Sequence, residues 1–130
     1  MKRIGIFGWK TGENSFGITA PYFSFLESFN STVEIITPSP EPRIDDLDLI
    51  VVPGGADVNP LNYGMVPSIF TGKSDPLKEF YDVYVLPRAI EAGIPIFGIC
   101  RGHQSIAVQR GLGLLQNMYH ETSVKDRADL

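Results

Sequence analysis

Short apolar runs alternate with amphipathic stretches along most of the 130 residues of this chain. Each run is flanked by glycine, proline or polar residues, which is typical of buried strands. The four strands that this pattern predicts cover residues 3–8, 33–37, 47–53 and 94–99. Strands that are apolar throughout and alternate with helices form parallel sheets covered on both faces. The pattern therefore predicts an α/β fold with a mostly parallel sheet.

The amphipathic stretches predict helices over residues 18–29, 75–92 and 101–110. In the first of them, Tyr22, Leu26 and Phe29 recur at helical spacing, so they predict the face that packs on the sheet. Phe25 lies beside this face. Pro21 fits the first turn of the helix, where its missing N–H costs nothing.

The predicted helix over residues 75–92 carries its own start, stop and interruption signals. Asp75 and Pro76 suit the N-cap and the first helical position. Gly93 suits the C-terminal cap. Pro87 lies inside the helix, so a kink or a break is expected there.

The remaining segments predict connections between these elements. Residues 9–17 are rich in turn formers and predict a loop, and residues 54–64 predict a longer loop directly after a strand. Residues 113–117 favour a fifth strand, and the polar residues 120–130 predict no regular structure.

The composition places the chain among globular proteins of a single domain, because 43% of its residues are apolar and 20% are charged. The formal net charge of −4 argues against a nucleic-acid partner. The single cysteine rules out an internal disulfide. No apolar run reaches the roughly 18 residues of a membrane helix, so no membrane partner is expected. The first apolar stretch is too short for a signal peptide, and a cytoplasmic protein is expected.

The segment with the most chemical information is the junction between the predicted strand 94–99 and the helix that follows. Gly98, Cys100 and Gly102 there form the pattern of a nucleophile elbow, glycine-x-nucleophile-x-glycine. The sharp turn strains the central residue and brings the flanking positions so close that both must be glycine. The helix N-terminus then favours thiolate over thiol. The alternative is that Cys100 is a buried core cysteine, which is common for free thiols.

A second candidate element, residues 53–55 (PGG), directly follows the predicted strand 47–53. Paired glycines at such a place let backbone N–H groups face a developing oxyanion. The alternative is a plain tight turn. Strand ends meet at one edge of a parallel sheet, so this loop and Cys100 are expected to lie together.

The motif GICRGHQ (residues 98–104) resembles the nucleophile motif of class I glutamine amidotransferases. Together with PGGADVNPLNYG, DPLKEFYDVYVLPRAIEAG and GLGLLQ it resembles the γ-glutamyl-γ-aminobutyrate hydrolases, or C26 peptidases, over nearly the whole chain. The resemblance implies a flavodoxin-like three-layer α/β sandwich. It also implies hydrolysis of a small γ-glutamyl amide through a thioester, with neither metal nor cofactor.

The resemblance also assigns roles to individual residues. Cys100 would be the nucleophile, and Gln104 would lie near the glutamyl group. Gly54, Gly55 and Arg101 would form the oxyanion hole, in which the N–H groups of Gly55 and Arg101 donate and Gly54 shapes the loop. Four residues of the long loop would line or shape the site, or else serve turn chemistry alone: Asp57, Asn59, Tyr63 and Gly64.

The chain departs from the family pattern in two ways. The acidic residue expected in the helix after Asp75-Pro76 is the shorter Asp82. The His-x-Glu pair that completes the family's triad has no counterpart, so residues 1–130 are expected to be the N-terminal portion of such a domain. His103 is expected to point away from the sulfur, and the adjacent His120-Glu121 pair lacks a strand to hold it.

Three functions stay open on the sequence: a γ-glutamyl hydrolase, an ammonia-supplying amidotransferase subunit, and a catalytically incomplete binding or regulatory homologue. The intracellular-protease branch of the superfamily ranks lower, because Arg101 stands where that branch has histidine after the cysteine. An incomplete domain would leave a sheet edge and apolar helix faces uncovered. Association with a second copy or with a complementing chain is therefore expected.

Overall fold

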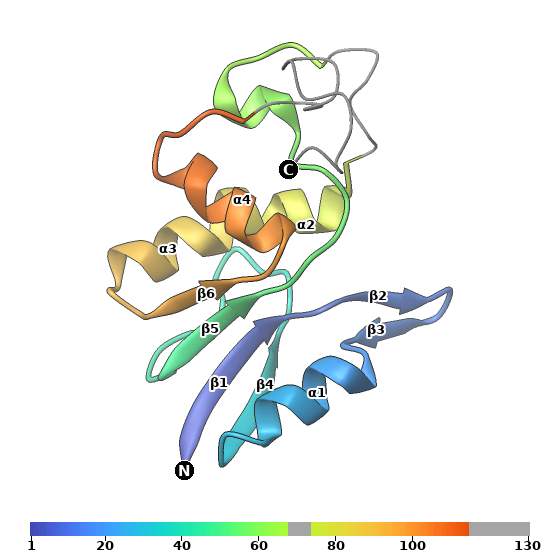
Figure 1. Cartoon of the computed structure of the whole chain (residues 1–130), viewed down its shortest axis with the longest axis vertical. Helices are drawn as coiled ribbons and strands as arrows, with labels where there is room; N and C mark the ends of the chain where they lie inside the picture. The colour runs from blue at the N-terminus through green and yellow to red at the C-terminus, as the bar shows by residue number, and fades with distance from the viewer. Residues whose placement is uncertain (68–73, 115–130) are drawn as a thin grey trace, which may run out of the picture.

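The computed structural model describes residues 1–67 and 74–114 and is built around a four-stranded sheet (Figure 1). The neighbouring strands run parallel in the order β4-β1-β5-β6. The strands are β1 (Lys2–Phe7), β4 (Ser31–Ile36), β5 (Leu49–Val52) and β6 (Ile96–Gly98). They fall within or close to the four predicted apolar runs, so the parallel α/β fold is confirmed.

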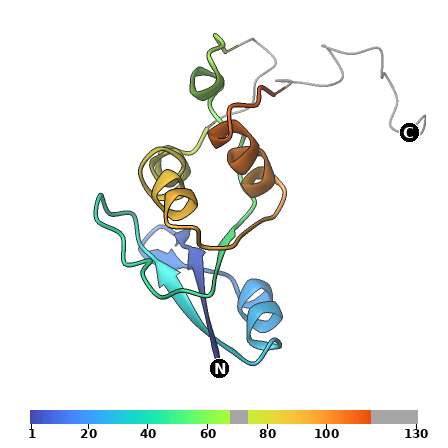
Figure 2. The same ribbon diagram turned by 90° about the vertical axis from the view of Figure 1, so that its left-hand side faces the viewer.

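Helices cover both faces of the sheet, as a flavodoxin-like three-layer sandwich requires (Figures 1 and 2). On β5, Ile50 and Val52 pack into one core cluster and Val51 into the other, because successive side chains of a strand point to opposite faces. One face packs against α1 (Ala20–Glu27). The other packs against α2 (Pro76–Phe80), the π-helical turn η2 (Tyr81–Val85), α3 (Leu86–Glu91) and α4 (Arg101–Gln109).

The helix predicted over residues 75–92 is interrupted just before Pro87, as expected. Proline has no N–H to donate to the preceding turn, and the π-helical turn η2 widens the helix there, so that the Leu86 N–H donates to the carbonyl of Tyr81. The predicted cap is also present, since the Asp75 carboxylate accepts from the Leu77 N–H at 2.9 Å. Gly93 ends the segment at φ +74°, in the left-handed region that glycine tolerates.

The loop predicted over residues 9–17 is wrong, because these residues form an antiparallel hairpin. Its strands are β2 (Trp9–Gly12) and β3 (Ser15–Gly17). Most of its side chains are exposed, so the hairpin has no apolar run to reveal it. Residues 54–64 are a loop with one 3₁₀ turn, η1 (Pro60–Tyr63). Gly113 and Leu114 form no regular structure, and the rest of the predicted fifth strand lies outside the described residues, as do residues 120–130.

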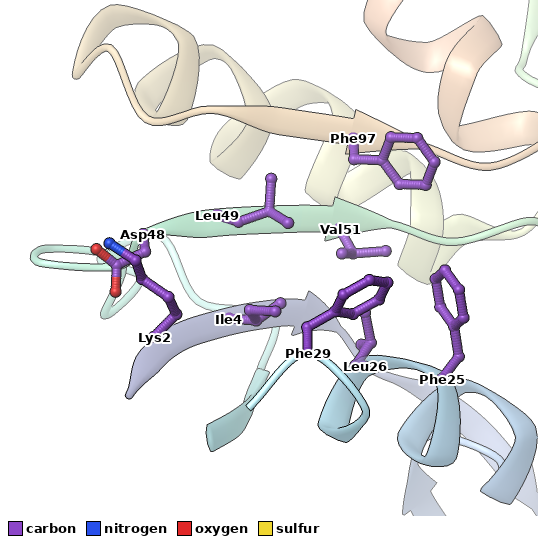
Figure 3. A pocket seen from close by; sticks show the side chains of 9 residues that line it. All are labelled: Lys2, Ile4, Phe25, Leu26, Phe29, Asp48, Leu49, Val51 and Phe97. Atoms are coloured by element: carbon purple, nitrogen blue, oxygen red, sulfur yellow. The ribbon is translucent and has the colours of Figure 1, made fainter. Parts of the chain in front are cut away.

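The α1 face of the sheet is only partly covered. Leu26 is buried, whereas Phe25 and Phe29 are 49% and 57% exposed, so the predicted packing face of this helix was too wide. Beside α1 lies an apolar hollow of about 500 Å³ over β5 and β6, into which Phe25, Phe29 and Phe97 project (Figure 3). Lys2 and Asp48 supply its charges. Among the described helices, none has both the length and the apolar character needed to cross a bilayer.

Candidate active site

Cys100 occupies the sharp connection between β6 and α4. Its backbone has φ +51° and ψ −111°, which is strained for a residue with a side chain. The thiol is exposed, which excludes the alternative of a buried core cysteine. The first turn of α4 closes immediately behind it, since the His103 N–H donates to the Cys100 carbonyl at 3.0 Å.

The two glycines flanking Cys100 stand where no side chain fits. A Cβ on Gly98 would lie 2.6 Å from the carbonyl carbon of Gly102. A Cβ on Gly102 would overlap the backbone carbonyl of Val52. The turn is therefore packed directly onto the end of β5, the strand that leads into the paired glycines.

The loop after β5 lies against Cys100. A Cβ on Gly54 would lie 3.5 Å from the Cβ of Cys100. The Gly54 N–H donates to the Tyr22 hydroxyl at 3.2 Å, and Lys78 Nζ donates to the Gly54 carbonyl at 2.9 Å. Among the hydrogen bonds of the described residues, none uses the N–H of Gly55 or of Arg101. These two N–H groups are therefore available to a substrate oxygen.

The side chain of Arg101 turns inward, away from solvent, into a buried ion cluster formed with Glu79 and Asp82. It binds Asp82 through two hydrogen bonds of 3.2 and 2.8 Å and Glu79 through one of 2.8 Å. It also donates to the Ser105 hydroxyl at 2.8 Å. Burial raises the pKa of the Asp82 carboxyl, and the hydrogen bonds and charge of Arg101 oppose that rise. The cluster fixes the start of α4 to the helix that follows Asp75.

Glu79 also anchors the long loop. Its carboxylate accepts from the Asn59 N–H at 2.9 Å and from the Asn62 side-chain amide. Asn59 caps η1, since its side-chain oxygen accepts from the Leu61 N–H at 3.0 Å. Gly64 ends η1 at φ +75°. For Asn59 and Gly64 the contacts are those of turn chemistry, and Asp57 and Tyr63 belong to the same loop.

Sequence reasoning missed Lys78, Glu79 and Ser105 as parts of this site. Lys78 is 9% exposed, and its ammonium lies 5.0 Å from the centroid of the Trp9 ring. Burial and then the charge of Arg101 lower the pKa of Lys78. The available signal was the spacing of Lys78 and Asp82, which puts them one turn apart on a helix that is otherwise mostly apolar.

The other candidate residues of α4 lie on its open side. His103 and Gln104 are exposed, and in the part of the chain that the structure describes neither side chain forms a hydrogen bond. His120 and Glu121 lie outside the described residues. Within the described ranges no group of three His, Cys, Asp or Glu residues is placed to hold a metal ion. The 500 Å³ hollow on the α1 face has no cysteine, serine or histidine in its lining, and Cys100 lies outside it.

Comparison with known proteins gives a match to the family model of Peptidase C26 over residues 10–129. That span contains the Gly54-Gly55 loop, the buried ion cluster and Cys100. The chain belongs to the Peptidase C26 family. This family is part of the class I glutamine amidotransferase-like group.

Relatives within this group carry matching names. The YvdE protein of Lactococcus lactis subsp. lactis, named as glutamine amidotransferase-like, is 32% identical over 107 residues, or 77% of this chain and 45% of that protein. A YvdE homologue of Lactococcus lactis subsp. cremoris is 31% identical over 73% of this chain and 54% of its own length. Rv2859c of Mycobacterium tuberculosis, also named for glutamine amidotransferase, is 30% identical over 78% of this chain and 35% of its own. The chain therefore spans about half the length of the curated relatives it matches, or less.

Proposed function

We propose that Cys100 is the nucleophile in hydrolysis of a γ-glutamyl amide. The observation that carries this proposal is an exposed cysteine with positive φ at a strand-to-helix turn, beside unused N–H groups of Gly55 and Arg101. This is the arrangement that a nucleophile elbow needs.

The proposed reaction has two steps. The sulfur of Cys100 attacks the γ-carbonyl carbon, a C–S bond forms, and the oxygen takes negative charge opposite the N–H groups of Gly55 and Arg101. The C–N bond then breaks, and the amine leaves with a proton supplied by an acid. Water hydrolyses the γ-glutamyl thioester, which releases glutamate and returns the thiol. Gln104, exposed in the first turn of α4, is proposed to contact the glutamyl group.

The acid and base of this reaction are proposed to come from outside the described residues. Among those residues the available imidazole is His103, and its side chain forms no hydrogen bond with Cys100. Geometry takes precedence over pKa in assigning a base.

An ammonia-supplying amidotransferase is the second candidate, and the names of the relatives favour it. The two candidates differ in the fate of the released amine. A hydrolase releases glutamate at a rate that no acceptor protein changes, whereas an amidotransferase subunit releases it faster with its synthase partner present.

The test is glutamate release from glutamine and a small panel of γ-glutamyl amides, with Cys100→Ala as the control. Release by the unaltered chain that Cys100→Ala abolishes supports the proposal. His103→Ala should leave that release unchanged. Absence of release, with Cys100 alkylated no faster than a free thiol, would overturn the proposal for this chain.

A further inference from the structure

The paired glycines leave the loop after β5 free to adopt many conformations, yet two polar side chains hold it from opposite faces of the sheet. Tyr22 of α1 accepts from the Gly54 N–H at 3.2 Å. Lys78 of α2 donates to the Gly54 carbonyl at 2.9 Å. Glycine populates positive and negative φ with similar ease, so without such anchors a Gly-Gly peptide can turn over.

The bond from Lys78 also determines where the Gly55 N–H points. The Gly54 carbonyl and the Gly55 N–H belong to one planar peptide unit, and no described peptide bond is cis. In a trans unit the C=O and N–H point in opposite directions. Because Lys78 holds the carbonyl, the Gly55 N–H must point away from Lys78, and within the described residues it meets no acceptor.

Burying the Lys78 ammonium costs folding free energy, which a residue with no more than a structural role would not need to do. Its ammonium is buried, and it forms no salt bridge within residues 1–67 and 74–114. Burial lowers the pKa of this amine, which is the signature of an ammonium taken out of water. The compensation comes from the Gly54 carbonyl and from the Trp9 ring, 5.0 Å away.

The contact between Lys78 and the loop extends along the side chain. A Cβ on Gly55 would lie 2.6 Å from Cδ of Lys78, so the lysine stem fills the space that a larger residue would need. A cation on the carbonyl also polarises the peptide, which strengthens the Gly55 N–H as a donor. The glycine and the lysine are therefore matched parts of one arrangement.

We propose that Lys78 is the positioning residue of the oxyanion hole: it orients the Gly54–Gly55 peptide so that the Gly55 N–H faces the oxygen of the substrate beside Cys100. This inference rests on the proposed function of Cys100. Lys78 acts through the peptide and touches no substrate atom.

The test uses two reagents for Cys100 in the full chain. The first is a chloroketone analogue of glutamine, in which the sulfur displaces chloride while the ketone oxygen occupies the oxyanion position. The second is iodoacetamide, in which the sulfur displaces iodide and no such position is required. The ratio of the two alkylation rates therefore reports the oxyanion hole separately from thiol exposure.

Three variants separate the hydrogen bond from the bulk of the side chain. Lys78→Met keeps the apolar stem and loses the donor, and the rate ratio should fall about tenfold or more. Lys78→Arg restores a cationic donor and should recover most of the ratio. Lys10→Met, at an exposed lysine of β2, should leave the ratio unchanged.

A second readout is independent of any reaction. The carbonyl ¹³C resonance of Gly54 and the amide resonance of Gly55 should both shift in Lys78→Met, while distant amides keep their positions. Should Lys78→Met fail to fold, Lys78→Gln, which keeps an uncharged donor, takes its place with a partial shift expected.

The outcomes distinguish the two proposals. Resonances that move together with a reduced ratio support the positioning role. A second outcome is that the resonances move but the unaltered chain has the same ratio of chloroketone to iodoacetamide alkylation rates as a free thiol. That outcome would overturn the function proposed for Cys100, while Lys78 would still orient the peptide. Unmoved Gly54 and Gly55 resonances, or an unchanged ratio in a chain that prefers the chloroketone, would overturn the role of Lys78.

Discussion

The two faces of the sheet differ in how closely the helices that cover them pack. On the face toward η2, α3 and α4, Val85 and Leu86 are fully buried, and the Tyr81 hydroxyl donates to the Ile36 carbonyl at 2.6 Å. On the face toward α1, Phe25 and Phe97 are about half exposed around an apolar hollow (Figure 3). The strands between them are shared, so the difference lies in the helices that cover each face.

The candidate chemistry depends chiefly on the better-packed face. Arg101, directly after Cys100, is held by Glu79 and Asp82, and the Gly54 carbonyl is held by Lys78. All three of these partners come from the helical segment that follows Asp75. The α1 face contributes a single hydroxyl, that of Tyr22. Rigidity at the site is therefore expected to follow the packing of α2 and η2 more than that of α1.

The largest expected effect comes from breaking the buried ion cluster. Asp82→Ala leaves Arg101 buried with a single carboxylate, and removing one partner of a buried pair costs about 3–5 kcal/mol of unfolding free energy. Urea unfolding measures the loss. The control is Glu34→Gln, which breaks the exposed pair with Arg3 on the sheet surface and should change little. Equal losses of unfolding free energy in both variants would contradict the contrast between the buried and the exposed ion pair.

Truncation of apolar side chains should separate the faces in the same way. Leu86→Ala removes a fully buried side chain and should cost about 3 kcal/mol, within the range of such truncations. Phe25→Ala, at a side chain 49% exposed, should cost about 0.5 kcal/mol or less. Thermal and urea unfolding of both variants give the comparison. A cost for Phe25→Ala as large as that for Leu86→Ala would mean that the α1 face is better covered than the structure indicates.

The apolar hollow should bind a hydrophobic fluorescent dye. Exposed apolar patches of this kind recruit such ligands. Phe97→Ser removes part of its wall and should weaken dye binding about fivefold, as expected for the loss of a half-buried ring. Leu112→Ser, at an exposed leucine beyond α4, is the matched control and should leave dye binding unchanged. Dye titration that responds equally to both variants would place the binding elsewhere.

The smallest effect concerns the protonation of Lys78. Its pKa in the folded chain lies below the ordinary value of 10.5, so the unfolded chain binds more protons between these two values. The unfolding free energy therefore rises with pH across that window. Lys78→Met lacks this rise, and the difference between the two chains at about pH 8 and pH 10 isolates it from the tyrosines. Parallel pH profiles of unfolding free energy for the two chains would contradict the burial of the Lys78 ammonium.

The strands and the sharp turn at Cys100 could be predicted because each leaves a local mark. An apolar run between breakers indicates a buried strand, and Gly98 and Gly102 mark the close approach around Cys100. The hairpin of residues 9–17 leaves no such mark, since its exposed side chains show no buried alternation.

The parts of the site that could not be predicted are contacts between distant residues. Lys78 meets the Gly54 carbonyl across 24 positions, and Arg101 meets Asp82 across 19. No spacing along the chain shows that α2 lies under the loop after β5. The resemblance pointed to Asp82 as an acidic position, and the structure supplies its partner, Arg101.

The central claim is that Cys100 attacks a γ-glutamyl carbonyl, and a γ-glutamyl 4-nitrophenyl ester tests it most directly. The sulfur forms a C–S bond as the C–O bond breaks, and nitrophenolate leaves without a proton, so this step needs no histidine. We expect a burst of nitrophenolate stoichiometric with the chain and a γ-glutamyl mass on Cys100, both absent in Cys100→Ala. Nitrophenolate release at the same rate in both chains, with no adduct on Cys100, would contradict it.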